Sequence, residues 1–121
     1  MVRDFDLIRK ILLEVQAMPA GIGAITVAFD GYSQNVVNEH AELLIEAGLL
    51  KGKAIRGMNG LWNVAIQGLT WAGHDFIDAA RDETLWAKAK ATILKPVVGI
   101  TFDALLQWLK QEVLEGLGRL H

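Results

Sequence analysis

Residues 49–66 read LLKGKAIRGMNGLWNVAI, and this stretch decides the fold. It contains two short runs that suit β-strands, 49–55 and 61–66, separated by a turn that closes with Asn59-Gly60. Asparagine and glycine both tolerate the positive φ angles of a tight turn, so this pair is a strong signal for a hairpin. The sequence therefore predicts two antiparallel strands joined by a glycine-rich tip.

An amphipathic helix is predicted directly before the hairpin, over residues 33–47. Ser33 is a suitable N-terminal cap, apolar side chains then recur on one side, and Gly48 supplies the C-terminal stop. His40 falls on or near the apolar side, where a buried, hydrogen-bonded histidine is the expected outcome. The three glutamates of this segment lie mostly on the opposite side, which we expect to face solvent.

The rest of the chain predicts further helices and one more strand. A β-branched and aromatic run bounded by glycines predicts a strand over 24–29. Gln67 and Gly68 are expected to end the second hairpin strand. Apolar residues three and four positions apart predict the helices, and Thr70 and Thr101 can cap two of them. The expected helices span residues 4–18, 70–80, 83–94 and 101–117, and a linker spans 96–99.

A helix followed by a two-stranded hairpin with a glycine-rich tip is the core of a winged helix. The strand over 24–29 would join the hairpin as a third member. A standard winged helix has two helices between its first strand and its hairpin. Here only the turn 30–32 precedes Ser33, so the supporting helix is expected to be reduced to a turn. We therefore predict a mainly α fold with a small β-sheet (α+β): a winged-helix-like domain over 1–80 and C-terminal helices over 81–121 for packing or oligomerisation.

Several stretches also resemble known proteins. Residues 39–52, EHAELLIEAGLLKG, resemble the end of a winged-helix second helix as it runs into the first strand of the wing. Residues 69–78, LTWAGHDFID, resemble the start of the helix after the wing in many small bacterial regulators. From residue 3 to about residue 90 the chain is similar to an uncharacterised family of small bacterial and phage-borne proteins, a domain of unknown function. That similarity rests on RDFDLIRKILLE at 3–14, the turn at 30–32, and TWAGHDFID and RDETLW at 70–78 and 81–86. The resemblance implies a winged-helix-like core and a mobile-element origin, and it implies no particular activity.

The composition indicates a soluble protein of the cytoplasm. The chain contains no cysteine, which excludes disulfides and thiolate metal sites and fits a reducing compartment. No apolar run approaches the roughly 18 residues that span a membrane, and the charged start does not have the pattern of a signal peptide. Hydrophobic residues make up 52% of the chain and include four tryptophans. So much apolar surface favours a homo-oligomer, with a dimer as the expected state.

The predicted oligomer contact is the wide apolar stripe of the last helix. This stripe could pack within the chain or against a second copy. We favour the second copy, because a small domain has limited other surface on which to bury it. The candidate interface residues are Phe102, Leu105, Leu106, Trp108, Leu109 and Val113.

A winged helix that reads DNA places the start of one helix in the major groove. Short polar side chains at the start of the 33–47 helix can bind bases or phosphates, and cations of the wing can neutralise phosphates. The candidate DNA-binding residues are Ser33, Gln34, Asn35, Asn38, Lys51, Lys53 and Arg56. Against this, the helix carries three glutamates and no lysine or arginine, and the chain's net charge is −2.

Two functions therefore stay open. The leading hypothesis is an accessory or regulatory protein of phage or mobile-element origin that binds double-stranded DNA. The alternative is a protein-interaction or assembly module that binds no nucleic acid.

Other chemistry has weaker support. His74 and Asp78 have the i, i+4 spacing of a metal pair, but an ion pair or a surface hydrogen bond explains them more simply. Among the tryptophans, only Trp62 beside the wing is a candidate platform for single-stranded nucleic acid. A nuclease-type carboxylate cluster could in principle form from Asp4, Asp6, Asp30 and Asp82. Charges at helix starts and in a turn explain these residues better, so we predict no enzyme activity, no cofactor and no metal.

Overall fold

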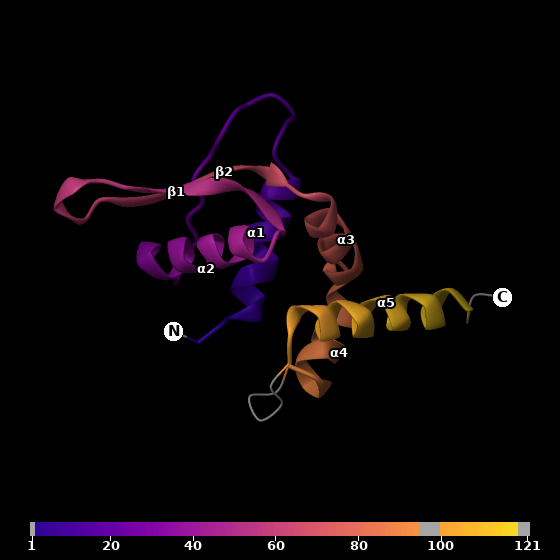
Figure 1. Cartoon of the computed structure of the whole chain (residues 1–121). Coiled ribbons are helices and arrows are strands. Elements are labelled where there is room, and N and C mark those ends of the chain that lie inside the picture. Colours follow the sequence, from indigo (N-terminus) through magenta and orange to yellow (C-terminus); the bar gives the residue numbers. More distant parts are fainter. Residues whose placement is uncertain (1, 95–99, 119–121) are drawn as a thin grey trace. The chain divides into compact units, whose positions relative to one another are not determined.

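The computed structural model describes residues 2–94 and 100–118 (Figure 1). This described part of the chain contains five α-helices and a two-stranded antiparallel sheet, which confirms the predicted mainly α fold with a small β component. The chain divides into two compact units, Met1–Asp75 and Phe76–His121. The predicted linker over 96–99 lies outside the described residues. None of the described helices is both long and apolar enough to cross a lipid bilayer.

Helix α1 (Phe5–Gln16) follows the predicted apolar spacing. The Asp4 carboxylate caps it by accepting a hydrogen bond from the Leu7 amide at 3.1 Å. This cap places a negative charge at the positive end of the helix dipole. The side chains that α1 buries recur along one face and are Leu7, Ile8, Ile11, Leu12 and Val15.

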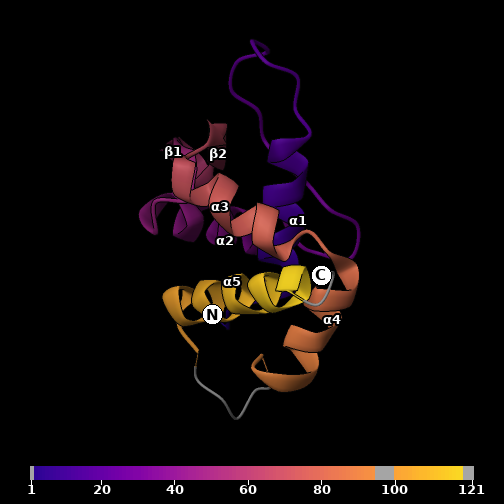
Figure 2. The same cartoon turned by 90° about the vertical axis from the view of Figure 1, so that its right-hand side faces the viewer.

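The loop after α1 replaces most of the predicted strand over 24–29 and projects past the end of that helix (Figure 2). Among the described residues of this loop, only Ile25 pairs with the sheet, through two backbone hydrogen bonds of 2.8 and 2.7 Å to Ile66. The Val27 carbonyl instead accepts a hydrogen bond from the side chain of Gln34 at 3.0 Å. The predicted strand is therefore wrong beyond its single bridge: the Val27 carbonyl binds the side chain of Gln34 in the following helix instead of the sheet.

Helix α2 (Gln34–Glu46) lies where the sequence predicts it. The Ser33 hydroxyl oxygen accepts a hydrogen bond from the Val36 amide at 3.2 Å, which confirms the predicted cap. Gly48 follows the helix at a φ of +78°, a left-handed conformation that favours glycine and ends the helix. Residues 30–32 form a turn, so the supporting helix is reduced to a turn before Ser33, as predicted.

His40 links α1 and α2 and is 1% exposed. Its Nε2 atom accepts a hydrogen bond from the Asp4 amide at 2.9 Å, and the Val36 carbonyl lies 2.8 Å from Nδ1. Because Nε2 is an acceptor here, the proton is assigned to Nδ1, which donates to that carbonyl. The predicted buried, hydrogen-bonded histidine is confirmed.

Tyr32 contacts the same corner of the fold. Its hydroxyl donates a hydrogen bond to Asp4 Oδ2 at 3.2 Å, and the Lys10 ammonium lies 5.6 Å from its ring centroid. Burial, followed by the negative charge and the hydrogen bond of Asp4 and the charge of Asp6, raises the pKa of Tyr32 above the ordinary value of 10.0.

This geometry predicts how Tyr32 titrates. It is the sole tyrosine of the chain, so tyrosinate absorbance reports it alone. We expect the midpoint in the folded protein to lie above the midpoint in concentrated urea. A raised pKa in the folded state means that the contact stabilises the fold below the unfolded pKa and that this stabilisation is lost as pH rises through the folded pKa. Tyr32→Phe should abolish that alkaline loss, whereas equal midpoints in the two states would contradict the prediction.

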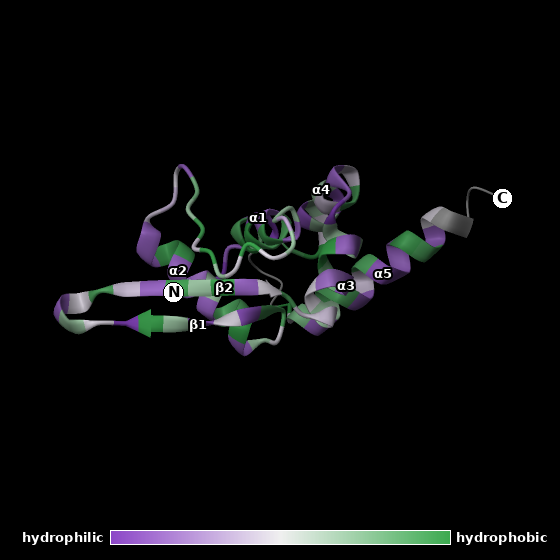
Figure 3. Cartoon of the chain, turned by 90° about the horizontal axis from the view of Figure 1, so that it is seen from above, coloured by the Kyte–Doolittle hydropathy of each residue, from purple (hydrophilic) through white to green (hydrophobic). Residues whose placement is uncertain are grey.

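Strands β1 (Leu50–Arg56) and β2 (Trp62–Leu69) form the predicted antiparallel hairpin. A short 3₁₀ turn, Met58–Gly60, closes its tip. Asn59 has a φ of 63° and Gly60 a φ of 77°, so both residues adopt the left-handed conformation on which the hairpin prediction rests. In Figure 3 the hairpin is a long ribbon that extends beyond the other elements of its unit.

The expected end of the second strand at Gln67-Gly68 is a bulge instead. Lys51 pairs with Gly68 and Gly52 pairs with Ile66, which leaves Gln67 as the extra residue. A Cβ atom on Gly52 would collide with the carbonyl oxygen of the facing strand. The bulge therefore bends the ribbon without ending the ladder, which continues to the last residue of β2.

Helix α3 (Trp71–Ala80) begins against the corner between α2 and β1. The Thr70 hydroxyl accepts from the Gly73 amide at 3.0 Å and donates to the Gly48 carbonyl at 2.5 Å, which confirms the predicted cap. Gly73 lies against the Leu49 carbonyl, where any Cβ would collide. The helix start is thus fixed to the hairpin, and the boundary between the two units falls later in the same helix.

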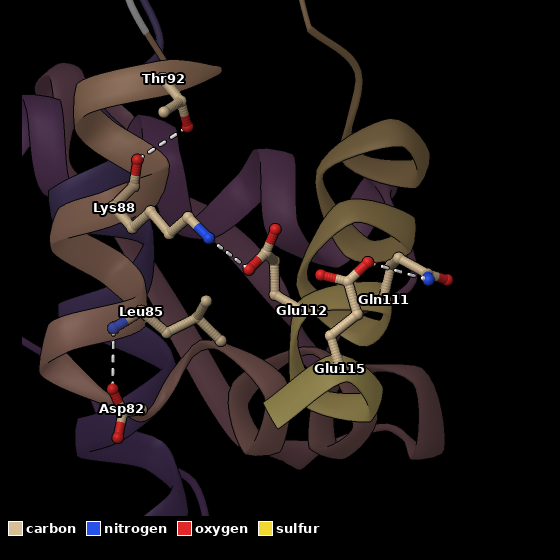
Figure 4. Close-up of polar contacts among 7 residues, drawn as sticks. All are labelled: Asp82, Leu85, Lys88, Thr92, Gln111, Glu112 and Glu115. Carbon is tan, nitrogen blue, oxygen red and sulfur yellow. Dashed lines mark hydrogen bonds and ion pairs between the residues drawn. The ribbon is translucent and has the colours of Figure 1, made fainter. Parts of the chain in front are cut away.

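The second unit contains α4 (Glu83–Thr92) and α5 (Phe102–Gly118). Asp82 has an extended backbone and its carboxylate accepts from the Leu85 amide at 2.7 Å, so α4 is a new helix and not a continuation of α3 (Figure 4). The Thr101 hydroxyl oxygen accepts from the Ala104 amide at 3.1 Å, which confirms this residue as the cap of α5.

A short ion pair joins α4 to α5. Lys88 Nζ lies 2.6 Å from Glu112 Oε2, and Figure 4 shows the lysine reaching across between the two helices. Beside this pair lies an open cleft of about 510 Å³ whose apolar lining includes Leu85 and Val113. In the same unit the rings of Phe76 and Phe102 meet edge to face, with centroids 5.4 Å apart.

Candidate nucleic-acid interface

The hairpin of β1 and β2 is positively charged, whereas α2 beside it carries three glutamates. The sequence contains no aspartate or glutamate from residue 47 to residue 74, and this span carries Lys51, Lys53 and Arg56. The net charge of the first half of the chain does not reveal this basic segment, because the three glutamates of α2 offset its three cations. A ribbon with three cations and no acid attracts polyanions such as nucleic acid phosphates.

The two lysines lie on the outer face of the hairpin. Side chains alternate between the two faces of a strand. Leu50 is buried and Ala54 lines a shallow hollow with residues of α2, so these two mark the inner face of β1. Lys51 and Lys53 therefore lie on the opposite face, where both are exposed. Neither lysine forms an ion pair within residues 2–94 and 100–118.

Arg56 lies on the inner face, away from the lysines with which the sequence grouped it. Its Nη2 atom lies 2.7 Å from Glu42 Oε1, and its guanidinium stacks over the Trp62 ring at 4.7 Å from the centroid. The same Glu42 oxygen accepts from Trp62 Nε1 at 2.6 Å. The arginine side chain is still 61% exposed, so it offers charge to a ligand while it helps to hold α2 against the hairpin.

Helix α2 runs along the hairpin with its start toward the tip. The Asn38 side chain donates to the Trp62 carbonyl at 3.0 Å, whereas the C-terminal end of α2 connects directly to the start of β1. Figure 1 shows the start of α2 and the hairpin tip on the same side of the first unit. The start of α2 and the hairpin tip therefore lie toward the same end of the first unit, whereas Lys51 and Lys53 lie on the hairpin face that points away from α2.

The four polar residues predicted at the start of α2 have different environments. Asn35 is exposed on the first turn, and the exposed Ser33 uses its hydroxyl oxygen as the helix cap. Gln34 donates to the side chain of Asn38 at 2.9 Å as well as to the loop. Asn38 is only 3% exposed, so its amide fixes α2 to the hairpin and does not face a ligand. Sequence reasoning missed this because a polar residue was assumed to be exposed.

Other candidate groups do not gather into a site. His74 and Asp78 are both exposed on α3. No group of three or more potential metal ligands occurs in the part of the chain that the structure describes. Asp4 and Asp82 are helix caps, as the simpler interpretation held. Trp71 is 85% exposed at the start of α3.

A larger cleft of about 560 Å³ lies between the end of α1, the 18–24 loop and the bulged end of β2. Its lining consists mainly of small or apolar residues and backbone, with side chains of Gln16, Gln67 and His74. Histidine is the one titratable side chain in this lining, so the cleft holds no pair of groups for acid and base catalysis.

The apolar stripe predicted as a dimer contact is largely covered within the chain. Leu105 and Leu109 are fully buried at 0% exposure, and Phe102, Leu106 and Trp108 are half-buried. Val113 is 39% exposed and its neighbour Leu114 is 63% exposed. Two central residues of the expected interface, Leu105 and Leu109, are therefore buried within the single chain, and the end of the stripe at Val113 stays exposed.

Comparison with other proteins identifies relatives for most of the chain. Residues 2–99 match the family described as "Hypothetical protein (DUF2513)". A protein of Haemophilus influenzae (strain ATCC 51907 / DSM 11121 / KW20 / Rd) described as "Uncharacterized protein" is 33% identical over 108 residues, which cover 88% of this chain and 91% of that protein. No solved structure matches.

Proposed function

The chain belongs to the DUF2513 family, and from the arrangement of its own residues we propose that it is a DNA-binding protein of winged-helix type. One observation carries the proposal: an acid-free, basic hairpin extends beside the exposed start of α2. In this assignment α2 is the helix that enters the major groove and the hairpin is the wing. The bridge between Ile25 and Ile66 supplies the remnant of the third strand. The resemblance to phage-borne proteins favours a regulatory or accessory role on a mobile element, in the cytoplasm where DNA is found.

Each contacting group has a chemical task in this proposal. Lys51 and Lys53 neutralise phosphates from the outer face of the wing. The first turn of α2 directs backbone amides and the positive end of its dipole at the DNA. The exposed Asn35 amide is suited to an adenine edge or a phosphate.

The glutamates of α2 weigh less against DNA binding than their number suggests. Glu42 is held by Arg56 and Trp62 and its side chain is 22% exposed. Glu46 lies eleven positions after Asn35 on the helix, which is about 16 Å along its axis. At physiological ionic strength, interactions between exposed charges are screened beyond about 8 Å. Glu39 is half-buried and is the remaining glutamate near the first turn.

The test is a titration of a labelled random-sequence duplex, followed by fluorescence anisotropy at several salt concentrations. We expect a Kd of roughly 10⁻⁴ to 10⁻⁶ M at physiological salt, as is usual for non-specific binding. The phosphate contacts of Lys51 and Lys53 contribute about −2 to the slope of log Kobs against log salt concentration. Absence of binding at low salt would overturn the proposal.

A protein-interaction module is the second candidate, and Trp71 and Leu114 favour it. These side chains are 85% and 63% exposed, which is unusual for large apolar residues without a partner. This alternative would be supported by two results together. The unaltered protein would bind a protein partner but no DNA, and the Trp71→Ala variant would no longer bind that partner.

A further inference from the structure

The hairpin tip exposes three large apolar side chains, which we call the tip cluster: Ile55, Met58 and Leu61. Met58 is 89% exposed, Leu61 58% and Ile55 44%. Single exposed apolar residues need no explanation, but three within one hairpin end do.

The tip cluster surrounds a turn that is closed by a backbone hydrogen bond. The Gly57 amide donates to the Leu61 carbonyl at 2.8 Å, which closes the turn below Met58. A Cβ on Gly57 would lie 3.1 Å from Leu61 Cδ2, so the leucine side chain lies over the glycine. The result is a narrow, two-stranded ribbon end whose turn is closed by a backbone hydrogen bond and which exposes its apolar side chains.

Charge identifies the ligand class. Lys53 flanks the tip cluster on the outer face, Arg56 flanks it on the inner face, and the whole hairpin lacks acidic residues. An apolar tip between cations on both faces complements nucleic acid, where stacked bases lie between two rows of phosphates. Proteins that bind the minor groove insert leucine, isoleucine or methionine between base steps and bend the duplex.

We propose that the tip cluster enters the minor groove of double-stranded DNA and bends it, an inference that rests on the proposed function. Met58, the most exposed member, partly unstacks a base step. Leu61 and Ile55 line the groove beside it, and Lys53 and Arg56 contact the phosphates on either side. The protein is then an architectural binder whose wing deforms DNA, and it needs no base-specific contact there.

The experiment uses a duplex with a donor and an acceptor dye at its ends, with binding followed by anisotropy in the same samples. Binding of the unaltered protein should raise energy transfer, because bending brings the two ends together. Met58→Ser combined with Leu61→Ser should lower affinity less than about tenfold and abolish the rise in transfer. Ile22→Ser removes another exposed apolar side chain, at 50% exposure and outside the hairpin, and should change neither readout.

Each other outcome has one meaning. If the unaltered protein binds without any change in energy transfer, or if the double variant bends DNA equally well, the insertion of the tip cluster into the minor groove is refuted. The proposed function then stands. A tip cluster that serves a protein partner instead would give this result. If the unaltered protein does not bind the duplex, both proposals fail. All replaced side chains are exposed, so the variants are expected to fold. Thermal unfolding checks this.

Discussion

Lys51→Glu combined with Lys53→Glu is expected to weaken duplex binding about a hundredfold at moderate salt. Each phosphate that a lysine neutralises contributes a factor of about 8 at 0.1 M salt, because it releases counterions with a slope of about 0.9. Losing two contacts gives about 60-fold, and the repulsion of two glutamates adds to it. The salt slope should also fall by about 2. Anisotropy titrations of the double variant beside the unaltered protein measure both quantities.

The control for this variant has the same change in net charge at another place. Lys90→Glu with Lys110→Glu makes the protein equally acidic in the second unit and should reduce affinity far less. All four lysines are exposed, and thermal unfolding of both double variants checks that they are folded. Unchanged affinity on reversal of the hairpin lysines would refute a role for the hairpin. Equal loss in both double variants would mean that net charge, and not the hairpin, governs binding.

Local signals allowed most elements of the fold to be predicted. Ser33, Thr70 and Thr101 each cap the helix that follows, because a hydroxyl in that place satisfies an amide without any distant partner. Asn59-Gly60 forms the turn for the same reason, since its backbone preference is its own. These features need no tertiary information, and the structure confirms them.

Features that depend on distant partners were not predictable. The strand over 24–29 has suitable residues, yet Gln34 takes the Val27 carbonyl and leaves a single bridge to Ile66. Asn38 is polar in sequence, but it is buried and donates its side-chain amide to the Trp62 carbonyl. No periodicity within one segment indicates which carbonyl a distant side chain will find.

The candidate interface shows the same division. Lysine and arginine at hairpin positions were identifiable from the sequence, and their alternation between faces follows from strand geometry once the strand bounds are known. The contact of Arg56 with Glu42 joins residues fourteen positions apart and required the packing of α2 on the hairpin. The tip cluster was visible as three apolar residues, but only their exposure distinguishes a ligand contact from a core.

The burial of Leu105 and Leu109 also changes the effect that is expected when leucines of the last helix are replaced. An exposed dimer stripe would give monomers when its leucines are replaced, with the fold intact. Leu105 and Leu109 are fully buried, so their replacement instead removes core contacts. A buried leucine replaced by alanine costs about 2–5 kcal/mol, since the transfer free energy is lost and a cavity remains. The fold, and not the association state, is therefore the property that should change.

We expect Leu109→Ala to lower the unfolding free energy by about 2–5 kcal/mol and the Tm by about 10 °C or more. Urea unfolding and thermal scans by circular dichroism measure the loss, and light scattering on a sizing column measures the mass. Leu114→Ala is the matched control on the same helix, because at 63% exposure it should cost less than about 0.5 kcal/mol. If Leu109→Ala halved the mass without lowering the Tm, the leucine would be an interface residue and its burial in the single chain would be refuted. If Leu114→Lys halved the mass at an unchanged Tm, a dimer would exist through the exposed end of α5 and not through the buried stripe.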